Sequence, residues 1–185
     1  RWEVRVTHHT PAGDLTERLA YPRDNPPCHI ERMVKNFQSD YKKLKYFYPE
    51  ITGYDDAVYR EQKAALGERG VMTITIGMPG LHAWQNYFEG NLEALTYAFY
   101  DYPDLFEELR LLDERTSLRR LELALEVQPD AILIGASGSL TLQSPTLWRQ
   151  LSLPTVQKVT RMCKQAGVLS GLHSCGKERY VIEVC

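Results

Sequence analysis

The sequence predicts an α/β fold whose strands are parallel. Three short runs, residues 71–76, 131–134 and 168–172, are rich in Val, Ile and Leu and indicate buried strands. Long stretches with a helical spacing of apolar residues separate these runs. Because parallel strands need crossovers of this length, which are right-handed, the alternation fits either a doubly wound sheet or a (β/α) barrel.

The first thirty residues predict an antiparallel hairpin. Residues 2–7 alternate apolar and polar side chains, which is typical of an antiparallel or edge strand. Residues 11–14 (PAGD) have the composition of a turn, and residues 15–21 provide a second strand. Residues 23–27 (RDNPP) form a loop, because two prolines remove backbone donors and constrain their neighbours.

Helices are predicted where apolar residues recur at spacings of three and four. Pro49 ends the first helix, and Pro103 and Pro145 begin two later helices as first-turn residues. Gly167 follows the end of the helix that Pro145 begins. The predicted helices cover residues 30–48, 57–68, 83–88, 91–100, 103–127 and 145–167, with a further helix beginning at residue 178.

The composition narrows the class of protein. The 185 residues are 43% hydrophobic and 25% charged, as in an ordinary globular protein. A formal net charge of -2 argues against a nucleic-acid partner, and no apolar run approaches the roughly 20 residues of a membrane span. Four scattered cysteines favour a reducing, cytoplasmic location over a disulfide scaffold. We therefore expect neither nucleic acid nor a membrane as partner.

The candidate metal site is the segment 168–175 (VLSGLHSC). His173 and Cys175 follow a predicted buried strand, at the carboxyl end where α/β sheets place their chemistry. Two residues apart in extended chain, both side chains leave the same face of the strand. An imidazole and a thiolate in this arrangement can hold half of a zinc site. Packing at a strand end is the alternative for both residues.

Two further loops hold candidate catalytic residues. His82 follows the first parallel strand and can act as a general acid or base, the alternative being an ordinary loop histidine. Ser137 lies in the segment 135–139 (GASGS), and with His173 it suggests a hydrolase. The segment lacks the G-x-S-x-G pattern, and it also lacks the patterns of phosphate-binding loops, so a tight strand-to-loop turn is the alternative.

Several phrases occur in an order that resembles one protein family. The motifs are the TPAG of residues 10–13, the MPGLHAWQNYFEG of residues 78–90, Pro129-Asp130, Ser144-Pro145, Leu153-Pro154 and the HSCG of residues 173–176. In this order they resemble the uroporphyrinogen decarboxylase family, which includes zinc-dependent corrinoid and coenzyme M methyltransferases. The similarity extends over residues 2–185.

The resemblance implies a (β/α)8 TIM barrel with its active site at the carboxyl mouth. Such barrels run to about 250 residues. We therefore expect residues 1–185 to form a single barrel domain that is incomplete at both ends. The methyltransferase branch binds zinc through a His-x-Cys pair and a later Cys. His173 and Cys175 match the pair, and the later Cys is expected beyond Cys185.

The function implied by the resemblance is zinc-dependent methyl transfer. The donor would be a methylated corrinoid, carried by a partner protein or bound as the substrate itself, and the acceptor a small thiol. A tetrapyrrole decarboxylase of porphyrin biosynthesis is the alternative, and a non-catalytic relative of the family is a third. The acidic residue common in the family after the strand 131–134 is replaced here by Ala136 or Ser137.

Overall fold

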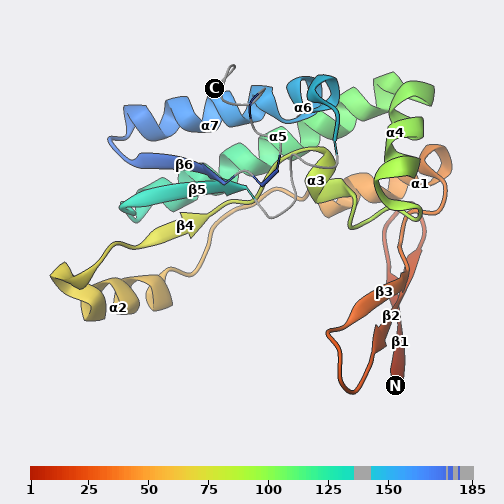
Figure 1. Cartoon of the computed structure of the whole chain (residues 1–185), viewed down its shortest axis with the longest axis horizontal. Coiled ribbons are helices and arrows are strands. Elements are labelled where there is room, and N and C mark those ends of the chain that lie inside the picture. The colour runs from red at the N-terminus through yellow and green to blue at the C-terminus, as the bar shows by residue number, and fades with distance from the viewer. Residues whose placement is uncertain (136–142, 174, 177–178, 180–185) are drawn as a thin grey trace. The chain divides into compact units, whose positions relative to one another are not determined.

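The computed structural model describes residues 1–135, 143–173, 175–176 and 179. The chain divides into two compact units. Unit 1 consists of Arg1–Pro49 with Trp84–Leu112, and unit 2 of Glu50–Ala83 with Asp113–Cys185. The boundaries fall within two helices, α3 (Leu81–Trp84) and α5 (Pro103–Glu126), so α5 contributes residues to both units (Figure 1).

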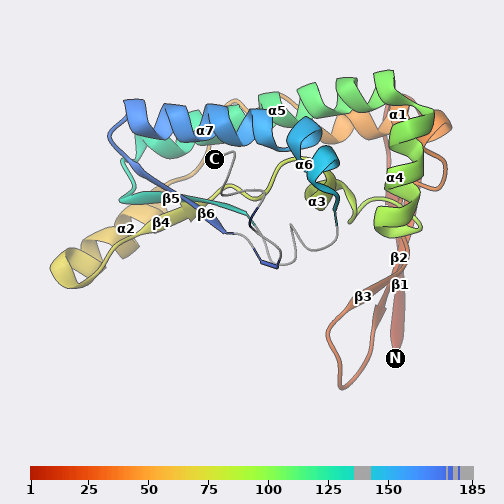
Figure 2. The ribbon, with the colours of Figure 1, turned by 45° about the horizontal axis from the view of Figure 1, so that its top comes forward.

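Unit 1 contains an antiparallel sheet of three strands in the order β1-β2-β3 (Figure 2). Strands β1 (Trp2–His8) and β2 (Leu15–Tyr21) pair in continuous register from Trp2↔Tyr21 to His8↔Leu15, which confirms the predicted hairpin. Strand β3 (Cys28–Glu31) pairs with β2 after a register shift at Arg18/Leu19. The apolar residue nearest the turn on β2, Leu15, is fully buried, whereas Trp2 at the far end is exposed.

The helices of unit 1 pack around a cluster of aromatic rings. They are α1 (Phe37–Leu44), the short 3-10 helix η1 (Lys45–Phe47), α4 (Asn91–Asp101) and the first half of α5. Phe37 contacts Phe106 with ring centroids 4.7 Å apart. The predicted helix 30–48 begins later than expected, because β3 takes its first residues and the side chain of Asn36 caps α1 by accepting from the Ser39 N–H.

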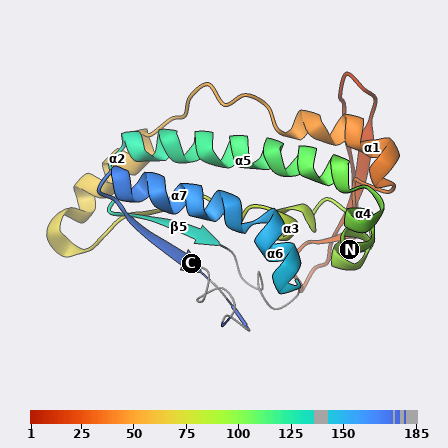
Figure 3. The same cartoon turned by 90° about the horizontal axis from the view of Figure 1, so that it is seen from above.

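Unit 2 contains a parallel sheet in the order β4-β5-β6. Its strands are β4 (Thr73–Thr75), β5 (Ala131–Gly135) and β6 (Leu169–His173), close to the predicted positions. Helices α5 and α7 (Leu153–Gln165) cover one face of this sheet (Figure 3). The core of the unit lies between them and contains Met78, Leu121, Ala124, Ile132, Ile134, Val156, Val159 and Cys163.

The remaining helices of unit 2 are α2 (Ala57–Leu66), the 3-10 helix η2 (Gly67–Arg69) and α6 (Pro145–Leu151). The single helix predicted over residues 145–167 is divided into α6 and α7 at Ser152. Pro154 explains the break, since it has no N–H to continue the α6 hydrogen-bond pattern and is suited to the first turn of α7.

The predicted TIM barrel is wrong. A barrel of this type needs eight parallel strands closed on themselves. The described part of the chain forms two small separate sheets, one antiparallel and one parallel, and no closed barrel. The first strands pair locally as a hairpin and never join the parallel sheet, while β4 and β6 are the two edges of an open sheet.

Candidate functional site at the end of β6

The candidate site lies where β5 and β6 end. The two strands run parallel, and their register pairs Gly135 with His173 as the last residues of each strand. Their carboxyl ends therefore meet at the same edge of the sheet, which is where open α/β sheets bind ligands. Cys175 follows two residues after His173.

His173 and Cys175 are in direct contact. Nε2 of His173 lies 2.9 Å from Sγ of Cys175. The His173 side chain is exposed and Cys175 is half-buried, so solvent and small molecules can reach the pair. An imidazole in contact with a thiol can accept its proton, and a thiolate is both the nucleophilic and the metal-binding form of cysteine.

Gly135 allows β5 to approach His173 closely. Its φ is +127°, in the region that favours glycine. A Cβ at this position would lie 2.5 Å from the backbone oxygen of His173 and 3.0 Å from the His173 Cβ. Any side chain there would displace His173, so Gly135 is a positioning residue for the pair. The sequence showed Gly135 only as part of a turn.

The donor chemistry of the pair fits two of the positions around a zinc ion. A nitrogen and a sulfur bound to one tetrahedral zinc lie about 3.5 Å apart, so the 2.9 Å contact would have to open slightly. Within residues 1–135, 143–173, 175–176 and 179, no three His, Cys, Asp or Glu side chains lie together in a way that could hold a metal ion. The structure thus brings together two of the side chains that the resemblance implies as zinc ligands.

The other predicted catalytic residues have different outcomes. His82 lies in α3 and is half-buried. Burial lowers the pKa of its imidazole, which favours the neutral form that can accept a proton at neutral pH. Ser137 lies outside the described residues.

The loop that leads to His82 is held by two buried residues that the sequence analysis did not identify. Asp113 accepts a hydrogen bond from the Gly80 N–H at 2.7 Å, and the Ser152 hydroxyl donates to the Pro79 carbonyl at 2.8 Å. Gly80 has a φ of +86°, and a Cβ there would lie 2.6 Å from Oγ of Ser152. These contacts fix the backbone that precedes His82.

Burial gives Asp113 an unusual ionisation. It raises the pKa of the carboxyl from 3.8 to about 6, although the Gly80 N–H and the charge of Arg120 act in the opposite direction. In the sequence, Asp113 could be recognised only as an aspartate within the predicted helix 103–127. Its burial depends on how α5 packs, which the helical pattern alone does not specify.

A groove of about 530 Å³ lies beside residues 170–172 of β6. It is formed by α7 and β6, and Arg161, Lys164 and Ser170 contribute polar groups to its lining. Leu172, also in the lining, directly precedes His173. Two cations and a hydroxyl in this groove suit a small anionic molecule, and neither His173 nor Cys175 belongs to its lining.

Comparison with known proteins finds none that is similar to this chain. No protein-family model, curated protein or solved structure matches this chain. Among the helices of the described residues, none has the length and apolar character needed to cross a membrane. Only the residues of the site therefore bear on its function.

Proposed function

We propose that this protein binds zinc through His173 and Cys175 and transfers a methyl group to a small thiol. The observation that supports the proposal is the 2.9 Å contact between Nε2 of His173 and Sγ of Cys175 at the carboxyl end of β6. The order of the residues, His-x-Cys, is that of the methyltransferases that the sequence resembles. The proposal does not depend on a barrel.

In this proposal, different residues of the chain have different roles at the site. Nε2 of His173 and Sγ of Cys175 hold the metal, and Gly135 keeps β5 close enough to fix the position of His173. When bound, zinc lowers the pKa of a substrate thiol so that a thiolate exists near neutral pH.

The methyl donor in this proposal is a methylated corrinoid. The acceptor sulfur forms a bond to the methyl carbon while the cobalt–carbon bond breaks and leaves its electron pair on cobalt. The thiol proton is released to solvent. A thiolate ligand is maintained in a reducing compartment, so we place the protein in the cytoplasm.

Metal analysis tests the ligand assignment. The purified protein is expected to carry zinc. His173→Ala and Cys175→Ser are each expected to lose most of it, because each removes one of the two proposed protein ligands and so lowers the affinity for zinc. Cys28→Ser is the matched control, because Cys28 is exposed on β3 in unit 1. Full zinc retention by both site variants would exclude the ligand assignment.

An activity assay tests the reaction. Methylcobalamin and 2-mercaptoethanesulfonate are supplied to the zinc-loaded protein, and methylated thiol is measured. Activity that disappears in Cys175→Ser and persists in Cys28→Ser supports the proposal. Zinc binding without methyl transfer would preserve the metal site and reject the reaction.

Decarboxylation of a tetrapyrrole is the second candidate function. The observation that favours it is the pair of cations in the groove, because decarboxylases of this class hold substrate carboxylates with cationic side chains. It requires no metal. Carbon dioxide release from uroporphyrinogen by a metal-free preparation, reduced by Arg161→Ala, would favour this reaction. A folded protein inactive in both assays would be a non-catalytic relative.

A further inference from the structure

In unit 1, the outer edge of β1 has no neighbouring strand among the described residues. β1 is an outer strand of its sheet, and β2 is its one strand partner in the part of the chain that the structure describes. It is seven residues long and contains no proline. Trp2 is 79% exposed and Val4 is 42% exposed. A long edge with exposed apolar side chains can accept a further strand.

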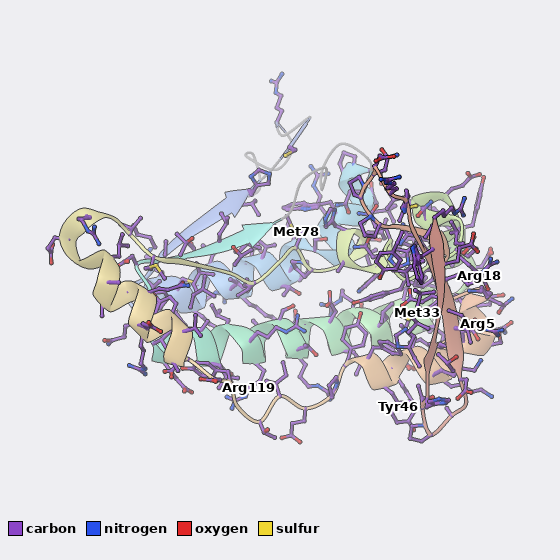
Figure 4. The ribbon with its side chains drawn as sticks, turned by 90° about the horizontal axis from the view of Figure 1, so that it is seen from below. Arg5, Arg18, Met33, Tyr46, Met78 and Arg119 are labelled. Carbon is purple, nitrogen blue, oxygen red and sulfur yellow. The ribbon has the colours of Figure 1, made fainter. Side chains whose placement is uncertain are left out.

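The charges on β1 leave one arginine without a partner. Glu3 accepts from Arg18 at 2.6 Å and pairs with Arg1 at 3.0 Å. Arg5 lies directly opposite Arg18 in the register, an arrangement of like charges that opposes pairing (Figure 4). Within the described residues, Arg5 makes no ion pair. A carboxylate brought to the open side of β1 would compensate its charge.

We propose that β1 pairs with the β1 strand of a second copy of this chain, antiparallel and with the two-fold axis at Val4. In this register Glu3 lies opposite Arg5 of the partner subunit, and the symmetry makes the same pair twice. Trp2 lies opposite Val6 of the partner subunit, and the two Val4 side chains face each other. Directly opposed residues project from the same face, so the apolar and the charged faces of the two hairpins continue into each other.

The spacing of the charges selects this register and favours a second copy as the partner. An antiparallel pairing centred on Glu3 would oppose two glutamates, and one centred on Arg5 would oppose two arginines. A pairing centred on Val4 instead places Glu3 of each copy opposite Arg5 of the partner subunit, so that opposite charges face each other twice. One pair of strands buries less surface than a standard interface, so the dimer is expected to be weak and reversible.

Register-specific cross-linking tests the geometry. Val4→Cys is made in a Cys28→Ser background and oxidised in the full chain at about 100 μM, well above a micromolar dissociation constant. Opposed Cβ atoms at the axis would be about 5 Å apart, within reach of a disulfide after small adjustments. Thr7→Cys in the same background is the matched control, because the two copies of Thr7 would lie roughly 20 Å apart.

Disulfide-linked dimer that forms with Val4→Cys and not with Thr7→Cys supports the proposal. Equal cross-linking of the two variants, or none in either, would overturn it. All other cysteines are the same in the two variants, so they contribute equally to any background.

Sedimentation of charge variants tests the ion pairs. Arg5→Glu brings a second glutamate opposite Glu3 in the dimer and is expected to raise the dissociation constant about tenfold. Within each hairpin the new glutamate faces Arg18, so folding is preserved, which far-UV circular dichroism checks. Exchanging both charges, in Glu3→Arg/Arg5→Glu, restores complementarity and is expected to restore dimerisation. A monomeric wild-type chain, or an Arg5→Glu variant that dimerises unchanged, would overturn the proposal.

Discussion

The two three-stranded sheets are held together in different ways. In the antiparallel sheet, β1 and β2 are neighbours in sequence, and side-chain contacts such as the Glu3–Arg18 ion pair and the His8–Glu17 hydrogen bond link them. In the parallel sheet, the strands come from distant parts of the chain and are held by the helices on one face. Ile132 and Ile134 of β5 are fully buried beneath α5 and α7.

The two sheets therefore differ in how exposed their side chains are and in where their strands end. The hairpin is polar, mostly exposed and stabilised by many weak pairs, so it tolerates change and offers an edge to a partner. The parallel sheet has a dry core, and its strands end together at one edge. That edge holds His173 beside Gly135, and Nε2 of His173 lies 2.9 Å from Sγ of Cys175, as the proposed metal site requires.

The largest expected difference between the sheets is the cost of removing one isoleucine side chain. Ile132→Ala on β5 is expected to lower the free energy of unfolding by about 4 kcal/mol, because Ile132 is fully buried in the core of unit 2. Ile30→Ala on β3 is the matched change and is expected to cost under about 1 kcal/mol, since Ile30 is 37% exposed. Urea denaturation followed by circular dichroism measures both. Equal losses would contradict the contrast between a dry and an exposed sheet.

The next largest effect concerns the close approach of β5 to β6. Gly135→Ala is expected to lower the free energy of unfolding by about 3 kcal/mol, because the backbone φ is positive and the new Cβ would contact His173. Gly77→Ala also has a positive φ, but its Cβ would meet nothing within 4 Å, so about 1 kcal/mol is expected. Unfolding experiments measure the stability of both variants, and zinc content reports on the site. If Gly135→Ala left zinc binding intact, Gly135 would have no role in positioning His173.

A pH-dependent effect is expected in unit 2. Burial raises the pKa of Asp113 from 3.8 to about 6, so between these values the folded chain keeps a proton that the unfolded chain has released. The free energy of unfolding therefore falls as the pH rises through this window, by about 3 kcal/mol. Asp113→Asn keeps an acceptor for the Gly80 N–H and is expected to lack this part of the slope.

Denaturation at several pH values between 4 and 7 measures the slope. Asp104→Asn removes an exposed carboxylate from the first turn of the same helix and serves as the control. A slope that Asp113→Asn and Asp104→Asn change equally would show that Asp113 is ionised in the folded protein throughout this range.

The smallest effect is expected in the hairpin. Oε1 of Glu17 lies 2.9 Å from Nε2 of His8, and Oε2 lies 3.2 Å from Nδ1 of His29. Glu17→Gln leaves either His8 or His29 facing an amide nitrogen. This change is expected to lower the free energy of unfolding by about 1 kcal/mol. Asp14→Asn, which affects the exposed pair with His9, is expected to cost under about 0.5 kcal/mol. A Glu17→Gln loss as large as that of Ile132→Ala would remove the distinction between the sheets.

The sequence predicted the strands more reliably than their assembly. The hairpin and the three parallel strands follow from alternation and from short apolar runs, and the structure confirms them. Repeated strand–helix units give the same local pattern in an open sheet and in a closed one, so the residues left both as alternatives. The closed barrel, which the family resemblance implied, is wrong. The division of residues 145–167 at Ser152 was signalled by Pro154 but was masked by the continuous apolar spacing.

The site was predictable only in part. Spacing alone places His173 and Cys175 on one side of an extended chain, and the two side chains are in contact. Gly135, Asp113 and Ser152 could not be assigned roles, since each acts on a residue more than thirty positions away. Such contacts depend on which strands and helices become neighbours, and no local pattern encodes that choice.

The different connections of the two sheets also imply an order of folding. The β1–β2 loop spans only residues 9–14, so the hairpin can close within microseconds. The crossover from β4 to β5 runs through residues 76–130, and that from β5 to β6 through residues 136–168. Closing loops of this length loses more chain entropy before any contact forms, and non-local pairing slows folding. The edge of β1 is therefore formed, and open to a partner, before His173 reaches its place beside Gly135.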